Sequence, residues 1–172
     1  MNTEKLNQQL FAPNARVYAV LDGASVPNLP MKLFEMNPPR YCLFAGELKP
    51  DMAEVAPYLV RLYPKTPFAE WVLKECWGQH WGIFARSRKS LNDMRAHFRS
   101  LTTVYDEKGD PMTFRFYDPR VLQSFLPTCK PAELKVFFGD VDTFFAESED
   151  DKLLSFNLAE ENNLKQSAID VQ

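Results

Sequence analysis

The sequence predicts an α/β (α+β) fold, a single domain in which helices pack on a mixed β-sheet. The chain has 172 residues, 45% of them hydrophobic and 14 of them phenylalanine, which suits one domain with a sizeable core. Stretches with a period of two alternate with stretches at helical spacing. Asp-Glu-Lys-Gly-Asp at 106–110 separates two strand-like runs, as in a hairpin, so the sheet contains at least one antiparallel pair.

The individual elements follow from periodicity, turn residues and caps. The predicted strands are 17–21, 41–44, 58–62, 80–85, 102–105, 112–117 and 141–146. The predicted helices are 3–10, 29–36, one opened by Thr66-Pro67 and ended by Gly78, one from the capping pair Ser90 and Asp93 to Leu101, one opened by Asp118 and stopped by Pro127, and 131–138. Residues 51–57 are ambiguous between helix and strand.

The charge distribution divides the chain into residues 1–146, an α/β domain, and residues 147–172, an acidic C-terminal segment. Residues 140–172 hold nine acidic and two basic side chains, net −7, against +4 for the remainder. The polar end from residue 160 has few apolar residues to bury, so the segment is expected to be partly mobile. The apolar residues of 153–158 interrupt it, as a last strand or a docking segment.

Composition also limits the class of partner and the cellular location of the protein. A net charge of −3 argues against nucleic acid as a partner. Cys42, Cys76 and Cys129 are odd in number and far apart, which argues against a disulfide framework. The N-terminal residues lack the apolar core of a signal peptide, and no run of about 18 apolar residues occurs. We therefore expect a cytoplasmic protein with no membrane contact.

The stretch 113–122 carries the clearest local signal. Asp118 occupies the place of a helix N-cap, and Pro119 the first helical position. Arg115 and Arg120 lie on either side of the cap, and a polar network of the three charged residues is expected. Its simplest role is to fix the turn before the helix.

A catalytic alternative uses two carboxylates. Asp22 and Asp118 each follow a predicted strand, and if those strands are neighbours the carboxylates could converge with Arg115 and Arg120 on an anionic ligand. The protein would then be a small hydrolase or an anionic-ligand-binding domain. No further base, metal-ligand spacing, phosphate loop or nucleotide motif completes such a site, so we expect no enzyme activity, no cofactor and no metal.

The two histidines support that expectation. His80 lies between Trp77 and Trp81 and is expected to be a hydrogen-bonded core residue, whereas His97 lies on a charged helix and is expected to be solvated.

Aromatic and basic residues are candidates for contact with a partner protein. Two adjacent pairs, Phe137–Phe138 and Phe144–Phe145, cannot easily place both rings in one core, so some could line an apolar surface. Arg95 and Arg99, four residues apart, share a helix face that is either solvated or in contact with an acidic tail or partner.

Several motifs together carry a resemblance. Tyr-Ala-Val-Leu-Asp-Gly-Ala at 18–24, Ala-Pro-Tyr-Leu-Val at 56–60, Trp-Gly-Ile at 81–83, Phe-Arg-Phe-Tyr-Asp-Pro-Arg-Val-Leu at 114–122, Phe-Leu-Pro at 125–127 and Phe-Gly-Asp-Val at 138–141 occur in this order. The chain thereby resembles the type VI secretion adaptors, or effector chaperones (Tap or TEC), a bacterial family first catalogued as a domain of unknown function. Asp22, Arg115, Asp118, Pro119 and Arg120 belong to the matching motifs.

The resemblance implies a function that composition does not. Adaptors of this family hold a cognate secreted effector in the cytoplasm and promote its loading onto the VgrG spike protein, without being secreted themselves. A chaperone of this kind needs an open groove or sheet edge to cover an apolar effector segment. A broad apolar groove would therefore favour an adaptor, and a deep pocket joining Asp22 and Asp118 would favour the catalytic alternative.

Overall fold

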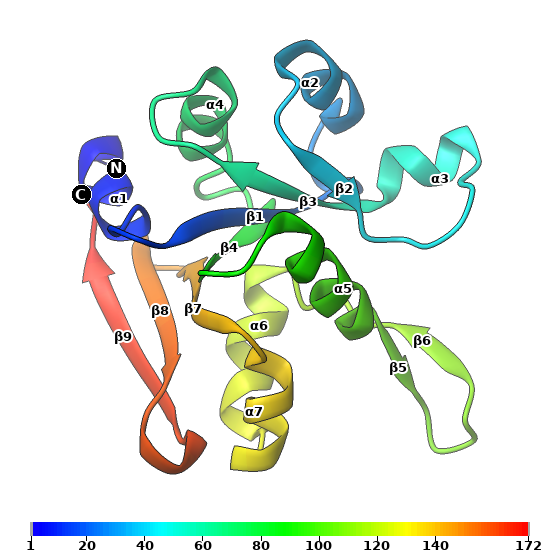
Figure 1. Ribbon diagram of the computed structural model, residues 1–172, viewed down its shortest axis with the longest axis vertical. Helices are drawn as coiled ribbons and strands as arrows, with labels where there is room; N and C mark the ends of the chain where they lie inside the picture. Colours follow the sequence, from blue (N-terminus) through cyan, green and yellow to red (C-terminus); the bar gives the residue numbers. More distant parts are fainter. Residues whose placement is uncertain (1, 172) are drawn as a thin grey trace.

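The computed structural model describes residues 2–171 and confirms the α/β class. Its centre is a seven-stranded sheet in the order β2-β3-β1-β4-β7-β8-β9, and β5 and β6 form a separate hairpin that projects from the body (Figure 1). The strands are β1 Arg16–Asp22, β2 Arg40–Cys42, β3 Pro57–Leu62, β4 Gly82–Ser87, β5 Thr103–Tyr105, β6 Pro111–Thr113, β7 Val141–Glu147, β8 Lys152–Leu158 and β9 Leu164–Asp170. Every paired ladder in the described part is antiparallel, so the sheet is not mixed.

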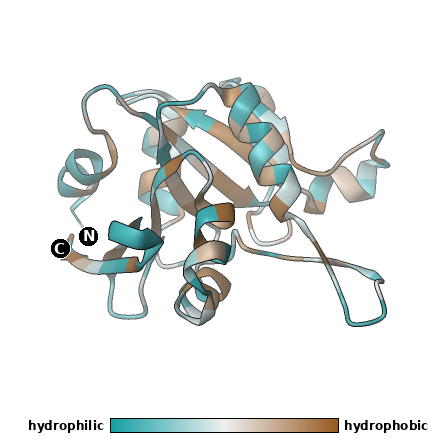
Figure 2. Cartoon of the chain, turned by 60° about the horizontal axis from the view of Figure 1, so that its bottom comes forward, coloured by the Kyte–Doolittle hydropathy of each residue, from teal (hydrophilic) through white to brown (hydrophobic). Residues whose placement is uncertain are grey.

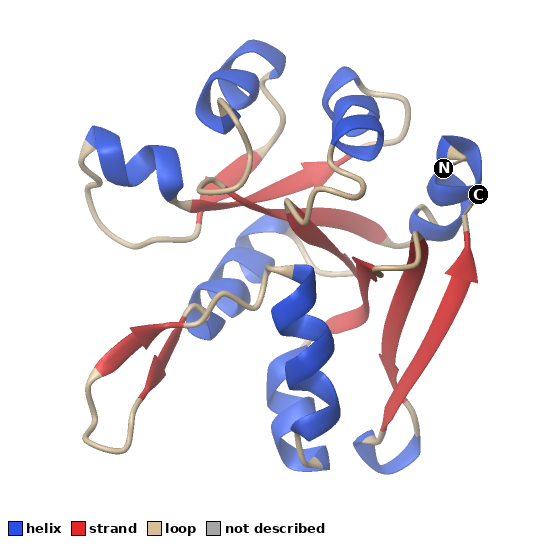
Figure 3. Cartoon of the chain, turned by 180° about the vertical axis from the view of Figure 1, so that it is seen from behind, coloured by secondary structure: helices blue, strands red, loops and turns tan. Residues whose placement is uncertain are grey.

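Helices cover both faces of the sheet (Figures 1 and 3). Helices α1, α2 and α4 pack on one face, and α5, α6 and α7 on the other. The helices are α1 Thr3–Leu10, α2 Leu29–Met36, α3 Pro50–Val55, α4 Pro67–Glu75, α5 Leu91–Leu101, α6 Pro119–Phe125 and α7 Pro131–Phe138, with short 3-10 turns η1 Leu126–Thr128 and η2 Glu160–Asn162. The molecule therefore has three layers and two cores.

Strand β1 separates these two cores. Val17, Ala19 and Leu21 point to the core under α1, α2 and α4, whereas Tyr18 and Val20 point to the core under α5–α7. Alternate residues of a strand point to opposite faces, and both faces are covered here, so the strand is apolar throughout rather than alternating. Hydrophobic colour accordingly concentrates on the sheet in Figure 2, while the tip of the β5–β6 hairpin is hydrophilic.

The predicted caps are confirmed. Asp118 has extended backbone angles, and its side chain accepts a hydrogen bond from the Arg120 N–H, with Pro119 at the start of α6. Ser90 and Asp93 form the reciprocal capping box of α5. Both motifs depend only on residues within three positions, which explains why the sequence is sufficient to predict them.

Some predicted boundaries are wrong. The strand predicted over 112–117 ends at Thr113, because a turn follows in which the Asp118 N–H donates to the Arg115 carbonyl. Phe116 and Tyr117 are adjacent and both buried there, so this stretch does not alternate between a buried and an exposed side as a strand would. Strand β4 begins at Gly82 rather than residue 80, and β2 covers only Arg40–Cys42.

The C-terminal segment also differs from its prediction. Residues predicted to form a partly mobile acidic extension from 147 onward instead complete the sheet as β8 and β9, and Glu147 is the last residue of β7. The alternative of a last strand over 153–158 is confirmed by β8. Val171 is fully buried, and its carbonyl accepts a hydrogen bond from the Asn2 N–H. The acidic side chains project from a hairpin whose apolar residues join the two cores.

Candidate functional site

A polar cluster lies where β1 ends. Asp22 is 1% exposed, and it accepts hydrogen bonds from the Ala24 N–H at 3.0 Å and the Ser25 hydroxyl at 2.9 Å. The Arg115 guanidinium forms an ion pair with the same carboxylate from the turn before α6. Arg115 thus joins the end of β1 to a turn 93 residues further along the chain.

A second ion pair lies beside it. Arg120 donates from Nε at 3.0 Å and from Nη2 at 2.7 Å to the two carboxylate oxygens of Asp118. The predicted network of Arg115, Asp118 and Arg120 is therefore divided: Asp118 pairs with Arg120, and Arg115 pairs with Asp22. The structure does bring the two aspartates into one neighbourhood, since Tyr117 lies within the electrostatic reach of both.

In this cluster each carboxylate is paired with an arginine. Burial raises the pKa of Tyr117 to about 12, and the negative charge of Asp22 adds to this effect. Each carboxylate faces an arginine and does not line any of the larger cavities described below. The two pairs tie the turn before α6 to the end of β1 and hold the first turn of that helix.

The Asp118 cap gives a pH-dependent prediction. Burial raises the pKa of the Asp118 carboxyl, but the hydrogen bonds and charge of Arg120, with a smaller effect of Arg115, outweigh it and hold the pKa below its usual value. A lowered folded-state pKa contributes stability above the unfolded pKa, which is lost as pH falls through the folded pKa. Asp118→Ala should cost about 0.5–2 kcal/mol at neutral pH through the lost cap.

Asp118→Asn separates charge from capping, because asparagine caps helices as well as aspartate. At neutral pH, Asp118→Asn should lose less stability than Asp118→Ala. This loss should shrink towards zero as the pH falls below about 4, the pKa of an unperturbed aspartate. Urea unfolding of the wild type and both variants across this range measures the effect. A deficit for Asp118→Asn that stays constant with pH would contradict the assigned ion pair.

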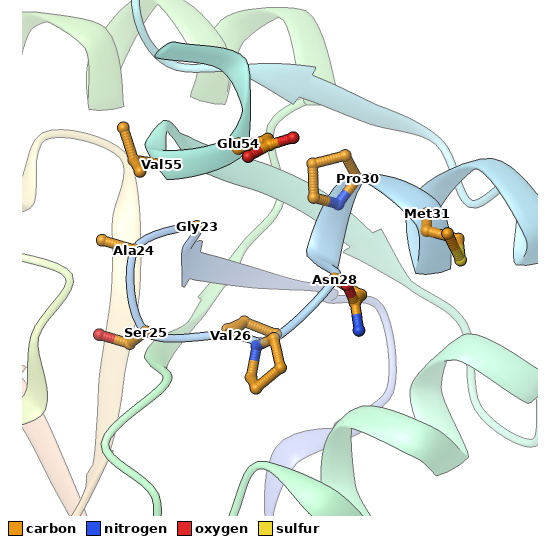
Figure 4. Close-up of a pocket in the computed structure, with 10 residues that line it drawn as sticks. Gly23, Ala24, Ser25, Val26, Asn28, Pro30, Met31, Glu54 and Val55 are labelled. Atoms are coloured by element: carbon orange, nitrogen blue, oxygen red, sulfur yellow. The ribbon is translucent and has the colours of Figure 1, made fainter. Parts of the chain in front are cut away.

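A hollow of about 530 Å³ lies beyond the end of β1, between the loop before α2 and the end of α3 (Figure 4). Gly23, Ala24, Ser25, Val26, Pro27, Asn28, Pro30, Met31, Glu54 and Val55 line it. Gly23 is required there, because a Cβ at this position would lie 2.4 Å from the Ala56 carbonyl oxygen. Glu54 is the single charged residue of the lining, so the hollow offers no set of groups for acid–base chemistry.

An apolar groove of about 460 Å³ lies on the opposite helical layer, where α5 and β5 face α6 and α7. Its residues are Ser100, Leu101, Thr103, Val104, Phe114, Phe125, Ala132, Glu133, Val136 and Phe137. Three rings form its floor: Phe114 and Phe125 lie 4.8 Å apart between centroids, and Phe125 and Phe137 lie 5.5 Å apart. We call this set the α5–α7 groove.

The rim of this groove exposes large apolar side chains. Val136 of α7 is 72% exposed, and Val104 of β5 is 38% exposed. On the projecting hairpin, Met112 pairs with Val104 across the strands and Tyr105 is also exposed. Clustered exposed apolar groups of this kind are typical of protein-binding surfaces.

Three of the four phenylalanines predicted as partner contacts lie outside the groove. Phe137, Phe138, Phe144 and Phe145 are all buried, which corrects their assignment to an exposed surface. Phe144 and Phe145 point to opposite faces of the sheet, into different cores, because both faces are covered. Phe137 alone contributes to the groove, as part of its floor.

The two arginines predicted as partner contacts are engaged within the molecule. Arg99 donates to the Cys42 and Phe44 carbonyls at 3.0 and 3.1 Å, and the Arg95 guanidinium lies 4.4 Å from the Tyr41 ring centroid. They fix β2 and the residues just after it onto α5. The C-terminal segment does not lie on this face, because it forms β8 and β9 at the other end of the sheet.

The histidines have structural partners. His80 adopts a left-handed turn in which its backbone N–H donates to Glu147 Oε1. Its ring is half-buried, and Nδ1 lies 2.9 Å from the same oxygen as an ion-pair contact. His97 is not solvated as predicted: its Nε2 lies 2.9 Å from the Phe137 carbonyl oxygen, and its ring packs against Gly139.

The described residues contain no cluster of three or more potential metal ligands, and none of their helices has the length and apolarity to span a membrane. Cys42, Cys76 and Cys129 are free thiols.

Sequence reasoning missed the residues that make the groove. Val136 lies between Lys135 and Phe137 on α7, on the helix side turned away from the buried Leu134 and Phe138. An apolar residue at a position that helical periodicity assigns to solvent was the available signal. The apolar pair Val104 and Met112 in a short hairpin was a second one.

The fold and this groove define a three-layer α/β domain with an exposed apolar groove. The chain belongs to the DUF4123 family, described as a domain of unknown function, whose model matches residues 17–135. The matched region runs from β1 into α7 and includes the Asp22–Arg115 pair and the Asp118 cap, whereas β7, β8 and β9 lie beyond it. No curated protein and no solved structure matches the chain.

Proposed function

We propose that this protein is a cytoplasmic, effector-specific adaptor that binds a type VI secretion effector and promotes its loading onto the VgrG spike. The observation that carries the proposal is the α5–α7 groove, with its aromatic floor and the exposed side chains of Val104 and Val136. The ordered motifs that resemble the adaptor family supply the identity of the partner. The closed ion pairs of Asp22 and Asp118 favour a binding protein over the hydrolase alternative.

The groove is suited to a chaperone that must later release its bound effector. It is open along the surface, so an effector segment can lay an apolar face onto the rings without threading through the protein. Val136 and Val104 stand on opposite elements of the rim and would contact such a segment from both sides. A specific complex should bury at least about 1,000 Å², so the exposed Met112, which pairs with Val104 across the hairpin, is expected to take part.

Val136→Asp should remove effector binding without unfolding the adaptor. Val136 is 72% exposed, so the substitution costs little in the free protein, but it would place an unpaired charge in an apolar interface. We expect the affinity for the cognate effector to fall at least about tenfold, equal to 1.4 kcal/mol. Co-expression, gel filtration and titration calorimetry measure the loss.

Phe34→Asp is the matched control, because Phe34 is 80% exposed on α2, in the other helical layer. It should bind the effector like the wild type. The proposal fails if Phe34→Asp abolishes binding and Val136→Asp does not, or if the effector is soluble and secreted normally without this protein. Turnover of a small substrate that depends on Asp22 and Asp118 would support the hydrolase instead.

A further inference from the structure

The sheet ends at β9, which pairs with β8 in continuous register from Lys152↔Asp170 to Leu158↔Leu164. Its other side has no neighbouring strand in the described part of the chain, and β9 is the outermost strand in Figure 1. It lies outside the family match, and none of its residues lines the α5–α7 groove, although the turn η2 that precedes it contacts α7. A role for this edge is thus independent of the adaptor proposal.

The register shows which backbone groups face outward. The Ala159 N–H donates to the Asn163 carbonyl, one step beyond the Leu158↔Leu164 pair. Hydrogen-bonded pairs alternate along an antiparallel ladder, so odd-numbered residues of β9 bond to β8. The N–H and carbonyl groups of Leu164, Gln166 and Ala168 therefore point away from the sheet.

The β7–β8 ladder supports the same assignment. The Ser148 N–H donates to the Lys152 carbonyl, so even-numbered residues of β8 bond to β7 and odd-numbered residues to β9.

The two edges of the sheet are protected differently. At the opposite edge, β2 has three residues and follows Pro38 and Pro39, and both shortness and proline discourage strand addition. Strand β9 has seven residues, no proline and no bulge. Natural sheets usually block a long regular edge, and Lys165 is the one lysine within β9, so most of this edge is suited to pairing with another strand.

The charge around the outer edge of β9 limits which strands can pair with it. Residues 148–170 carry six acidic and two basic side chains, net −4. The acidic groups are exposed at both ends of the edge: Glu149, Asp150, Asp151 and Asp170 at one end, and Glu160 and Glu161 at the other. A second copy of this chain would bring the same negative charge to the edge, whereas a basic strand would neutralise it.

We propose that the outer edge of β9 is a strand-addition site for an extended, basic segment of a partner polypeptide. The segment would bond to the outward groups of Leu164, Gln166 and Ala168. Its lysines or arginines would lie near the acidic turns at either end. Backbone hydrogen bonds would hold the segment, and charge would select it.

The probe is a capped heptapeptide of alternating lysine and valine, Lys-Val-Lys-Val-Lys-Val-Lys, added to the isotope-labelled full chain. Amide chemical shifts in nuclear magnetic resonance spectra should move most at Leu164, Gln166 and Ala168, and hydrogen exchange of these amides should slow on binding. The same peptide with glutamate for lysine should bind at least tenfold more weakly. A peptide N-methylated throughout keeps its charge but loses the strand's donors, and should also bind at least tenfold more weakly.

Ala168→Pro removes one outward N–H without touching the ladder to β8, so the fold should persist and peptide affinity should fall at least tenfold. Ser167→Thr, an exposed neighbour that keeps every backbone donor, should bind like the wild type. The inference is wrong if the lysine peptide does not bind, or if the N-methylated peptide binds equally well, since charge alone would then explain the attraction. A dimer of the free protein that Ala168→Pro dissociates would also overturn it, in favour of a second copy.

Discussion

Arg115→Met should destabilise the protein by about 2–3 kcal/mol, less than the roughly 3–5 kcal/mol of a fully buried pair because the Arg115 side chain is 46% exposed. The substitution keeps the aliphatic bulk of the side chain but leaves the Asp22 carboxylate, 1% exposed, without its cation. Ala24 and Ser25 still donate hydrogen bonds to it, but neither neutralises its charge. The midpoint of thermal unfolding should fall by several degrees, at about 2–4 °C for each kcal/mol in a protein of this size.

Two variants identify the cause. Arg120→Met removes the arginine of the neighbouring Asp118–Arg120 pair, which is more exposed than Arg115. Asp118 still caps the helix through the backbone, so the free energy of unfolding should change little. Asp22→Asn combined with Arg115→Met removes the buried charge as well, and should recover part of the stability lost in the single variant. If Arg115→Met and Arg120→Met have the same small effect, the Asp22–Arg115 pair does not hold the turn onto β1.

Truncation after Ala159 should be the most damaging change that leaves the family-matched region intact. It removes β9 with the fully buried Val171 and the half-buried Leu164 and Ile169. It also uncovers one side of β8, whose Leu153 and Phe156 are completely buried. Burial of a Val or Leu side chain stabilises by about 1.5–3 kcal/mol, so the loss should reach about 3–6 kcal/mol before the lost ladder is considered.

The truncated protein is expected to melt at a much lower temperature or to aggregate through the uncovered edge of β8. Circular dichroism and light scattering during heating measure both outcomes. Glu160→Gln with Glu161→Gln changes the charge of the same segment without removing the strand, and should melt close to the wild type. A truncated chain as stable as the full one would restore the sequence-based view of a dispensable acidic tail.

The sequence by itself determined the features that depend on near neighbours. Asp118 and Pro119 start α6, Ser90 and Asp93 cap α5, and the turn at 106–110 joins β5 to β6, as predicted. The free energy of such motifs comes from hydrogen bonds and backbone preferences within a few residues. The class of fold followed from these elements together.

Contacts between distant segments were decided only by the tertiary structure. The sequence could place Asp22 after one predicted strand and Arg115 within another, but the tertiary structure decides that they pair across 93 residues. The phenylalanines are visible in the sequence. Their burial is not, because it depends on the helices that cover both faces of the sheet. These helices bury all four phenylalanines predicted as partner contacts and leave Val136 exposed. The acidic residues after Glu147 suggested a tail because charge pattern reports solvent exposure, not strand pairing. Partner strands lie outside any local window, so β9 and the α5–α7 groove became visible only once the chain was folded.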